Sequence, residues 1–116
     1  MNVLVVVNDP PYGSERPYNA LRHANALGKR TDVTVRLFLL ADAVQCARRG
    51  QQTPSGYYNI ERMLTVAARQ DTEIAACGSC LDTRGLKTED LVEGVRRGSM
   101  EELAAWTLWA DRVIVY

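Results

Sequence analysis

The sequence has 116 residues, the size of one ordinary domain, and its 47% hydrophobic and 24% charged content is typical of a chain that folds around a core. Lysine plus arginine and aspartate plus glutamate each number 14, so the net charge is zero, which excludes a nucleic-acid binder that depends on a basic excess. No apolar run approaches the length of a membrane span, and the N-terminus shows no basic leader or cleavage site.

The first half of the chain alternates strand and helix patterns. Val3–Val7 is a continuous β-branched run, typical of a strand buried on both faces of a parallel sheet. After a loop over Asn8–Ser14, apolar residues at helical spacing predict a helix over Pro17–Gly28, with proline in its first turn and glycine at its end. Val33–Leu40 alternates as a second strand, and a short helix is predicted over Asp42–Arg49.

The pattern continues beyond the turn-rich loop Gln51–Tyr58, which could cover a pocket or meet a neighbouring subunit. Apolar residues over Ile60–Ala67 form the stripe of a second long helix. A short third strand is predicted within Glu73–Cys77, and a short helix is predicted to begin at Thr88.

The last segment carries a helix and the final strand. Ser99 and Glu102 match a capping box that begins a third long helix. Trp106 and Trp109, at helical spacing, favour core and subunit contacts over a ligand cage. The chain ends in a strand over Arg112–Tyr116.

Strands that alternate with helices predict an α/β fold, here a small doubly wound, mostly parallel sheet with helices on both faces. Ligands bind such sheets beyond the carboxyl ends of the strands, near the point where the strand order reverses. If that point lies between the first and third strands, the loops Asn8–Ser14 and Cys77–Gly85 meet there. We therefore look for the chemistry in these two segments.

The segment Cys77–Gly85 carries the strongest chemical signal. Cys77 follows a buried strand, Gly78 allows close approach to the backbone, and Arg84 together with backbone N–H groups would favour a thiolate. Three cysteines are an odd number, which fits a reducing, cytoplasmic location of a single domain over residues 1–116 better than a disulfide framework.

The spacing of Cys77 and Cys80 has several interpretations. A zinc site needs about four ligands, and only His23 and Cys46 remain as partners, so we expect no metal. A dithiol redox pair, one reactive cysteine with a resolving or packing neighbour, and two small buried hydrophobes all stay open. The residues around Cys77 favour the single reactive cysteine.

Other segments carry weaker signals. In the first loop, Asp9 and Tyr12 either contact a substrate or partner as the wall of a pocket, or belong to a plain turn. His23 is expected to be partly exposed on its helix, Cys46 to be a packing residue, and the pair Arg96–Arg97 to be a solvated face.

Six stretches, in this order, give the chain a resemblance to the DsrE/DsrF-like family, the sulfur-relay group that includes the YchN-like proteins and the TusD-type carriers. The segment from Cys77 to Leu86 is the most specific of them. The six stretches are Pro11–Gly13, Tyr18–Arg22, Phe38–Val44, Gly56–Asn59, Cys77–Leu86 and Gly94–Arg97.

The resemblance implies a small flavodoxin-like α/β fold and assembly into a homo-oligomer, a trimer or a hexamer, with pockets near subunit boundaries. In the relay members one cysteine at a strand end accepts and passes on sulfane sulfur, and the spacing to Arg84 assigns that position to Cys77. Cys80 matches the second cysteine of the YchN-like branch and has no counterpart in the TusD-type carriers.

Our leading hypothesis is therefore a persulfide carrier without cofactor, a possible sulfurtransferase that works with sulfur donor and acceptor proteins. Cys77 would hold the sulfur, Arg84 would stabilise it, and the loop with Asp9 and Tyr12 would shape access. The rival hypotheses are a non-catalytic oligomeric module that binds a small ligand or protein, and a dithiol redox protein that uses Cys77 and Cys80.

Overall fold

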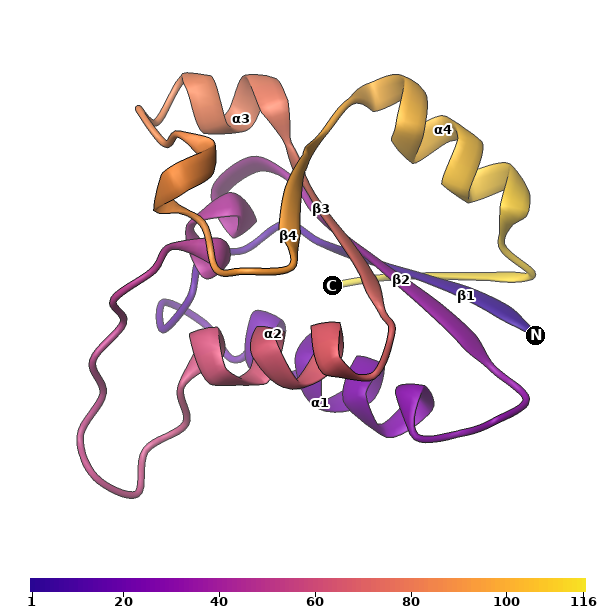
Figure 1. The fold of residues 1–116 in the computed structure, drawn as a ribbon, viewed down its shortest axis with the longest axis horizontal. Helices are drawn as coiled ribbons and strands as arrows, with labels where there is room; N and C mark the ends of the chain where they lie inside the picture. Colours follow the sequence, from indigo (N-terminus) through magenta and orange to yellow (C-terminus); the bar gives the residue numbers. More distant parts are fainter.

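A computed structural model describes residues 1–116, and a five-stranded sheet runs through the middle of the molecule (Figure 1). The strands pair in parallel throughout, in the order β4-β3-β2-β1-β5, which confirms the predicted α/β class. Their bounds are β1 Asn2–Val7, β2 Thr34–Leu39, β3 Glu73–Cys77, β4 Val95–Gly98 and β5 Arg112–Val115.

The core of the sheet follows from the apolar runs. Every residue of Val3–Val7 is buried, because β1 has a strand on each side and helices over both faces. In the register of β1 with β2, Val7 lies opposite Leu39, and Leu39 in turn lies opposite Ala76 of β3. The carboxyl ends of these strands therefore meet at one edge of the sheet, where the polar loops begin.

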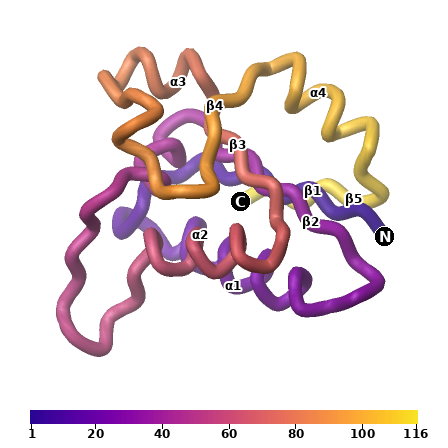
Figure 2. Tube along the Cα trace, in the orientation of Figure 1, coloured from indigo at the N-terminus to yellow at the C-terminus, as the bar shows by residue number.

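The helices divide between the two faces (Figure 2). α1 and α2 pack side by side on one face, and α4 covers the other. A short helix, α3, and a 3-10 helix, η1, lie at the carboxyl edge between them. The bounds are α1 Arg16–Gly28, η1 Ala41–Ala47, α2 Ile60–Arg69, α3 Gly78–Asp82, η2 Thr88–Asp90 (also 3-10) and α4 Met100–Trp109.

Local sequence signals explain where the long helices begin. The Asn59 side chain accepts a hydrogen bond from the Arg62 N–H and caps α2, and burial of Leu64 stabilises that helix by roughly 1.5–3 kcal/mol. Ser99 caps α4 by accepting from the Glu102 N–H at 3.2 Å. The Glu102 carboxylate pairs with Arg96 and does not bond back to the Ser99 N–H. Of the predicted capping box, only the bond accepted by the Ser99 side chain is therefore formed.

Several predicted boundaries were wrong. The predicted helix over Asp42–Arg49 is the 3-10 helix Ala41–Ala47, and the one predicted at Thr88 is a single 3-10 turn. The strand order reverses between β1 and β5, and not between the first and third strands, because β2 separates β1 from β3. The edge strand β4 (Val95–Gly98) was not predicted, although Arg96 and Arg97 within it are exposed, as expected.

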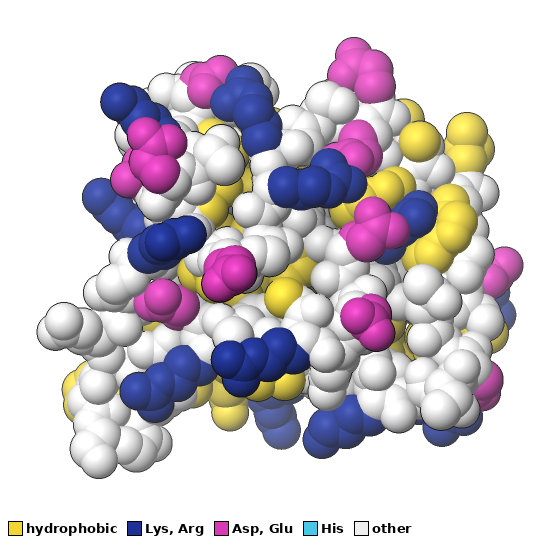
Figure 3. Space-filling model, in the orientation of Figure 1, with side chains coloured by type: hydrophobic (Ala, Val, Ile, Leu, Met, Phe, Trp, Pro, Cys, Tyr) yellow, Lys and Arg dark blue, Asp and Glu magenta, His cyan; other side chains and the backbone are white.

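The surface carries charges of both signs interspersed, and apolar side chains are visible over α4 (Figure 3). Trp106 faces the core, where its ring meets Phe38 edge-on at 5.9 Å, while Arg36 covers the ring of Trp109 at 4.0 Å. Leu108, on the outer side of α4, is 88% exposed. None of the helices combines the length and the apolar character that crossing a membrane requires.

Candidate functional site

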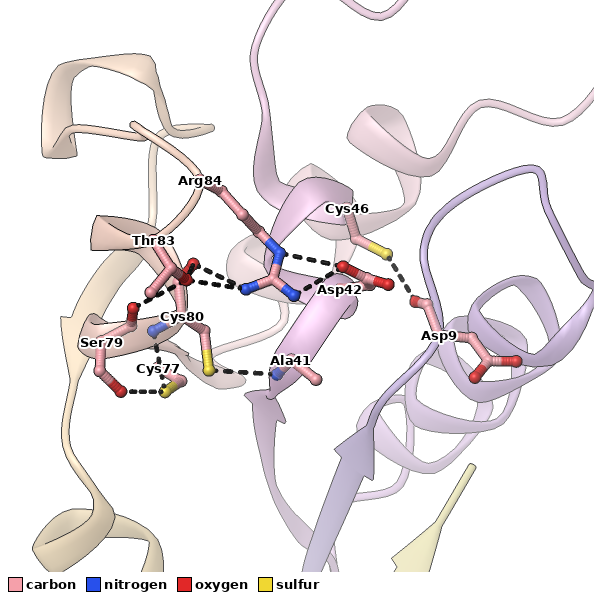
Figure 4. Close-up of polar contacts among 9 residues, drawn as sticks. All are labelled: Asp9, Ala41, Asp42, Cys46, Cys77, Ser79, Cys80, Thr83 and Arg84. Carbon is pink, nitrogen blue, oxygen red and sulfur yellow. Dashed lines mark hydrogen bonds and ion pairs between the residues drawn. The ribbon is translucent and has the colours of Figure 1, made fainter.

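Cys77 occupies the junction between β3 and α3, since it is both the last residue of the strand and the N-cap of the helix. Its Sγ accepts the Cys80 backbone N–H at 3.4 Å and lies 3.4 Å from the Ser79 hydroxyl (Figure 4). The helix turn thus points two hydrogen-bonding groups at one sulfur atom. Cys77 therefore lies at the end of the third strand, as the sequence predicts.

These contacts decide the protonation of the sulfur. Burial raises the pKa of the Cys77 thiol, but hydrogen bonds from the side chains and backbones of Cys80 and Ser79 outweigh it and lower the pKa below its ordinary value. The residue is only 5% exposed, so the sulfur is sheltered. Burial raises the pKa of the Cys80 thiol most, and the hydrogen bond with Cys77 adds to that effect, so Cys77 is the more acidic of the two thiols.

Cys77 lines a cleft of about 330 Å³ at the carboxyl ends of β3 and β4. One wall is the start of α3 and the other is the turn from β4 into α4. The lining residues are Cys77, Gly78, Ser79, Arg97, Gly98, Ser99, Met100 and Glu101. Clefts beyond the carboxyl ends of parallel strands are the usual ligand sites of such sheets.

Arg97 contributes the positively charged side chain that lines this cleft. It lies so close over Gly78 that a Cβ atom there would come within 2.8 Å of its guanidinium. Two hydrogen bonds to Asp82, at 2.7 and 2.8 Å, hold it in place. Asp82 raises the pKa of Arg97 most, and the charge of Cys77 adds to that effect, so attraction between Arg97 and the thiolate is mutual.

Arg84, which we expected to stabilise Cys77, is placed elsewhere. Its guanidinium donates to Asp42 at 2.6 and 3.0 Å and to the Cys80 carbonyl at 3.0 Å. It is absent from the cleft lining, and its charge acts on the thiol of Cys80. The turn that follows α3 directs Arg84 towards Asp42 of η1 and not towards Cys77 (Figure 4).

The expected wall formed by Asp9 and Tyr12 is also absent from this cleft. The Asp9 carboxylate accepts from Ser14 at 2.8 Å, and its backbone carbonyl accepts from the Cys46 thiol. The Tyr12 hydroxyl donates to Gln51 and accepts the Ile60 N–H at 3.1 Å. This loop therefore connects β1 with η1 and α2. It lies away from the cleft because β2 separates β1 from β3 in the sheet.

Cys46 and His23, the other potentially reactive side chains, lie outside the cleft. Cys46 is 1% exposed, as expected for a packing residue, and burial raises the pKa of its thiol to about 12. His23 is partly exposed, as predicted, and its Nδ1 lies 2.8 Å from the Tyr116 hydroxyl. No group of three or more His, Cys, Asp or Glu side chains is placed to hold a metal ion.

Comparison with known proteins places the chain among relatives of its own length. The model of the DsrE/DsrF-like family matches residues 1–116. The chain is 43% identical to Protein YchN of Escherichia coli K12 over 115 residues, which are 98% of this chain and 97% of the relative. It is 38% identical to uncharacterized protein MK0008 of Methanopyrus kandleri over 98% of this chain and 93% of that one.

Solved structures agree. The crystal structure of the E. coli YchN protein matches with a TM-score of 0.94 and 42% identity, over 100% of this chain and 99% of that one. The protein MTH1491 of Methanobacterium thermoautotrophicum shares the fold, with a TM-score of 0.78 at 17% identity, over 100% of this chain and 99% of that one. By sequence and by structure, the chain belongs to the DsrE/DsrF-like family.

Proposed function

We propose that this protein is a sulfur carrier that accepts sulfane sulfur on Cys77 and passes it to a partner thiol. The observation that carries the proposal is the Cys77 sulfur itself. Hydrogen bonds hold its pKa below the ordinary value, and it lines a cleft that also contains Arg97. A thiolate, and not a thiol, is the nucleophile in sulfur exchange.

The chemistry needs only thiols. The Cys77 thiolate attacks the outer sulfur of a donor persulfide R–S–SH, a new S–S bond forms, and the donor leaves as R–S⁻. The product is Cys77–S–SH. An acceptor thiolate then attacks the outer sulfur and restores the Cys77 thiolate. Since sulfur supplies both the bond that forms and the bond that breaks, no cofactor takes part.

The cleft suits the loaded state. A persulfide extends the side chain by one atom, and the outer sulfur would lie in the cleft near Arg97, which favours its anion. Gly78 lets the guanidinium approach the backbone at this point. Membership of a family that includes sulfur-relay proteins supports the same reaction, while the comparisons identify neither donor nor acceptor.

Exposure of the full-length protein to glutathione persulfide, followed by intact mass spectrometry, tests the proposal. We expect a gain of about one sulfur mass on the wild-type chain and none on Cys77→Ser. Cys46→Ser is the matched control, because Cys46 is buried away from the cleft and its loss should leave loading unchanged. Loading of Cys77→Ser equal to that of wild type would refute the carrier role.

We also propose that copies of the chain associate through the outer side of α4 and the edge strand β5. On α4, Leu108 is 88% exposed and Met100 58%, and Val115 of β5 is 64% exposed, so association through these elements would remove apolar side chains from water. Light scattering on Leu108→Glu should give a smaller particle than wild type. A wild-type protein that is monomeric would contradict this proposal and leave the chemistry of Cys77 untouched.

A further inference from the structure

The second cysteine of the site has surroundings of its own. Cys80 lies three residues beyond Cys77, in the first turn of α3, so the two side chains are neighbours. The Cys80 backbone N–H donates to Cys77 Sγ at 3.4 Å, so the start of α3 joins the two residues directly. Such a spacing permits a disulfide without movement of the sheet.

A backbone group of η1 contacts the Cys80 sulfur. The Ala41 N–H donates to Cys80 Sγ at 3.3 Å, and Ala41 adopts a φ of +53°, which is uncommon for a residue with a side chain. Arg84, fixed by Asp42, contributes a positive charge. Burial and the neighbouring Cys77 raise the pKa of Cys80, while Ala41 and Arg84 oppose them. Cys80 is therefore the less acidic of the two thiols.

The two sulfurs also face different spaces. The cleft that would receive the outer sulfur of a loaded Cys77 is lined by Ser79 and Arg97 and does not include Cys80. Cys80 Sγ is directed towards Ala41 instead (Figure 4). Displacement at a sulfur atom requires the nucleophile and the leaving group to lie on different sides of that atom. Here the nucleophile would be Cys80 and the leaving group the outer sulfur of loaded Cys77.

We propose that Cys80 discharges a loaded Cys77 as hydrogen sulfide, a step that rests on the proposed function. The Cys80 thiol loses its proton to water, and the thiolate attacks Cys77 Sγ of Cys77–S–SH. The S–S bond to the outer sulfur breaks, and that sulfur leaves as HS⁻. The products are a Cys77–Cys80 disulfide and one sulfide ion. The outer sulfur is reduced by two electrons, and the two cysteines are oxidised by two.

This step gives the protein a second outcome besides transfer. Loading moves the negative charge from Cys77 Sγ to the outer sulfur, which weakens one cause of the raised pKa of Cys80. An acceptor thiol bound at the cleft competes with Cys80 for the loaded Cys77. Without an acceptor, Cys80 releases the outer sulfur as sulfide. A small dithiol would then reduce the disulfide and return the chain to its starting state.

The test follows a loaded chain over time. Wild-type protein is exposed briefly to glutathione persulfide, freed of excess donor, and sampled for intact mass and released sulfide. We expect the mass gain to decay into a chain about two hydrogens lighter than the reduced protein, with one sulfide per disulfide. Cleavage after Arg69 and Arg84 should release one peptide, residues 70–84, that carries the disulfide.

Variants separate this step from loading. Cys80→Ser should load and keep its extra sulfur about tenfold longer or more, because the intramolecular thiol acts at a high effective concentration. Arg84→Gln should slow sulfide release without affecting loading, and Cys46→Ser should behave as wild type.

The outcomes are distinct. If wild type and Cys80→Ser load equally and lose sulfur at equal rates, Cys80 plays no such part and the carrier role stands. If neither loads, the proposed function itself fails. The wild-type chain is decisive without any variant, because loss of the outer sulfur without a Cys77–Cys80 disulfide would overturn the inference.

Discussion

The contact between Arg97 and Gly78 makes Gly78→Ala an informative substitution. The new methyl group would lie 2.8 Å from the guanidinium, whereas ordinary contact begins at 3.4 Å, so Arg97 must move by at least 0.6 Å. Arg97 is a flexible side chain on an edge strand, and alanine is a better helix former than glycine by about 0.5–1 kcal/mol. The free energy of unfolding should therefore change by less than about 1 kcal/mol, while the charge beside Cys77 is displaced.

The assay measures both quantities. Urea unfolding gives the stability, and the rate of iodoacetamide alkylation at Cys77, followed by peptide mass spectrometry across pH, gives the pKa of its thiol. We expect the rate profile to move to higher pH, a change that simple crowding of the cleft would not produce.

The matched control is Gly13→Ala, whose methyl group would meet Pro10 at an ordinary 3.6 Å and should change neither quantity. An unchanged profile in Gly78→Ala would refute the role given to Arg97.

Three further predictions follow from individual contacts. Arg97→Gln should raise the pKa of Cys77, whereas Arg84→Gln should not, since Arg84 acts on the neighbouring thiol; alkylation profiles that shift equally would contradict this assignment. Because burial raises the folded pKa of Cys46 to about 12, the unfolded chain loses that proton first, and stability should fall as pH rises from about 9 towards 12. Urea unfolding of Cys46→Ala should show a shallower alkaline decline, and an identical slope would count against a buried neutral thiol. Leu64→Ala should cost about 2–5 kcal/mol by the same method, because Leu64 is fully buried; a cost below about 1 kcal/mol would mean that α2 packs more loosely than described.

The sequence predicted the elements whose apolar pattern is long enough to read. The buried run Val3–Val7, the stripe of α2 and the cap at Ser99 are each formed as expected. The edge strand β4 could not be predicted in this way, because Val95 is its only apolar residue and its parallel pairing with β3 is what makes it a strand. Nothing in four residues with two arginines distinguishes such a strand from a solvated loop.

Because β4 was not predicted, the sequence pointed to Arg84, and not to Arg97, as the positive charge beside Cys77. Arg84 is near Cys77 in the sequence, but α3, which was expected to be a loop, directs it towards Asp42. Arg97 is twenty residues from Cys77 and reaches it only because β4 lies beside β3, with Cys77 opposite Gly98. One signal was available: an arginine just before the glycine and serine that begin the next helix.

The spacing of the two cysteines left their roles open, in a segment that was expected to be a loop and that forms the first turn of α3. The spacing does not predict which sulfur is the stronger acid, since that depends on Ser79, on the Cys80 N–H and on Ala41 from a distant part of the chain. Tertiary contacts, and not local pattern, therefore assign the roles.

The acidity of Cys77 can be measured on the native wild-type chain as the pH dependence of alkylation at each cysteine. We expect Cys77 to react with a midpoint below the value of about 8.5 that is ordinary for a free thiol, while Cys46 does not react until the chain unfolds. A Cys77 that titrates at or above that value, or that stays inert in the folded protein, would contradict this expectation.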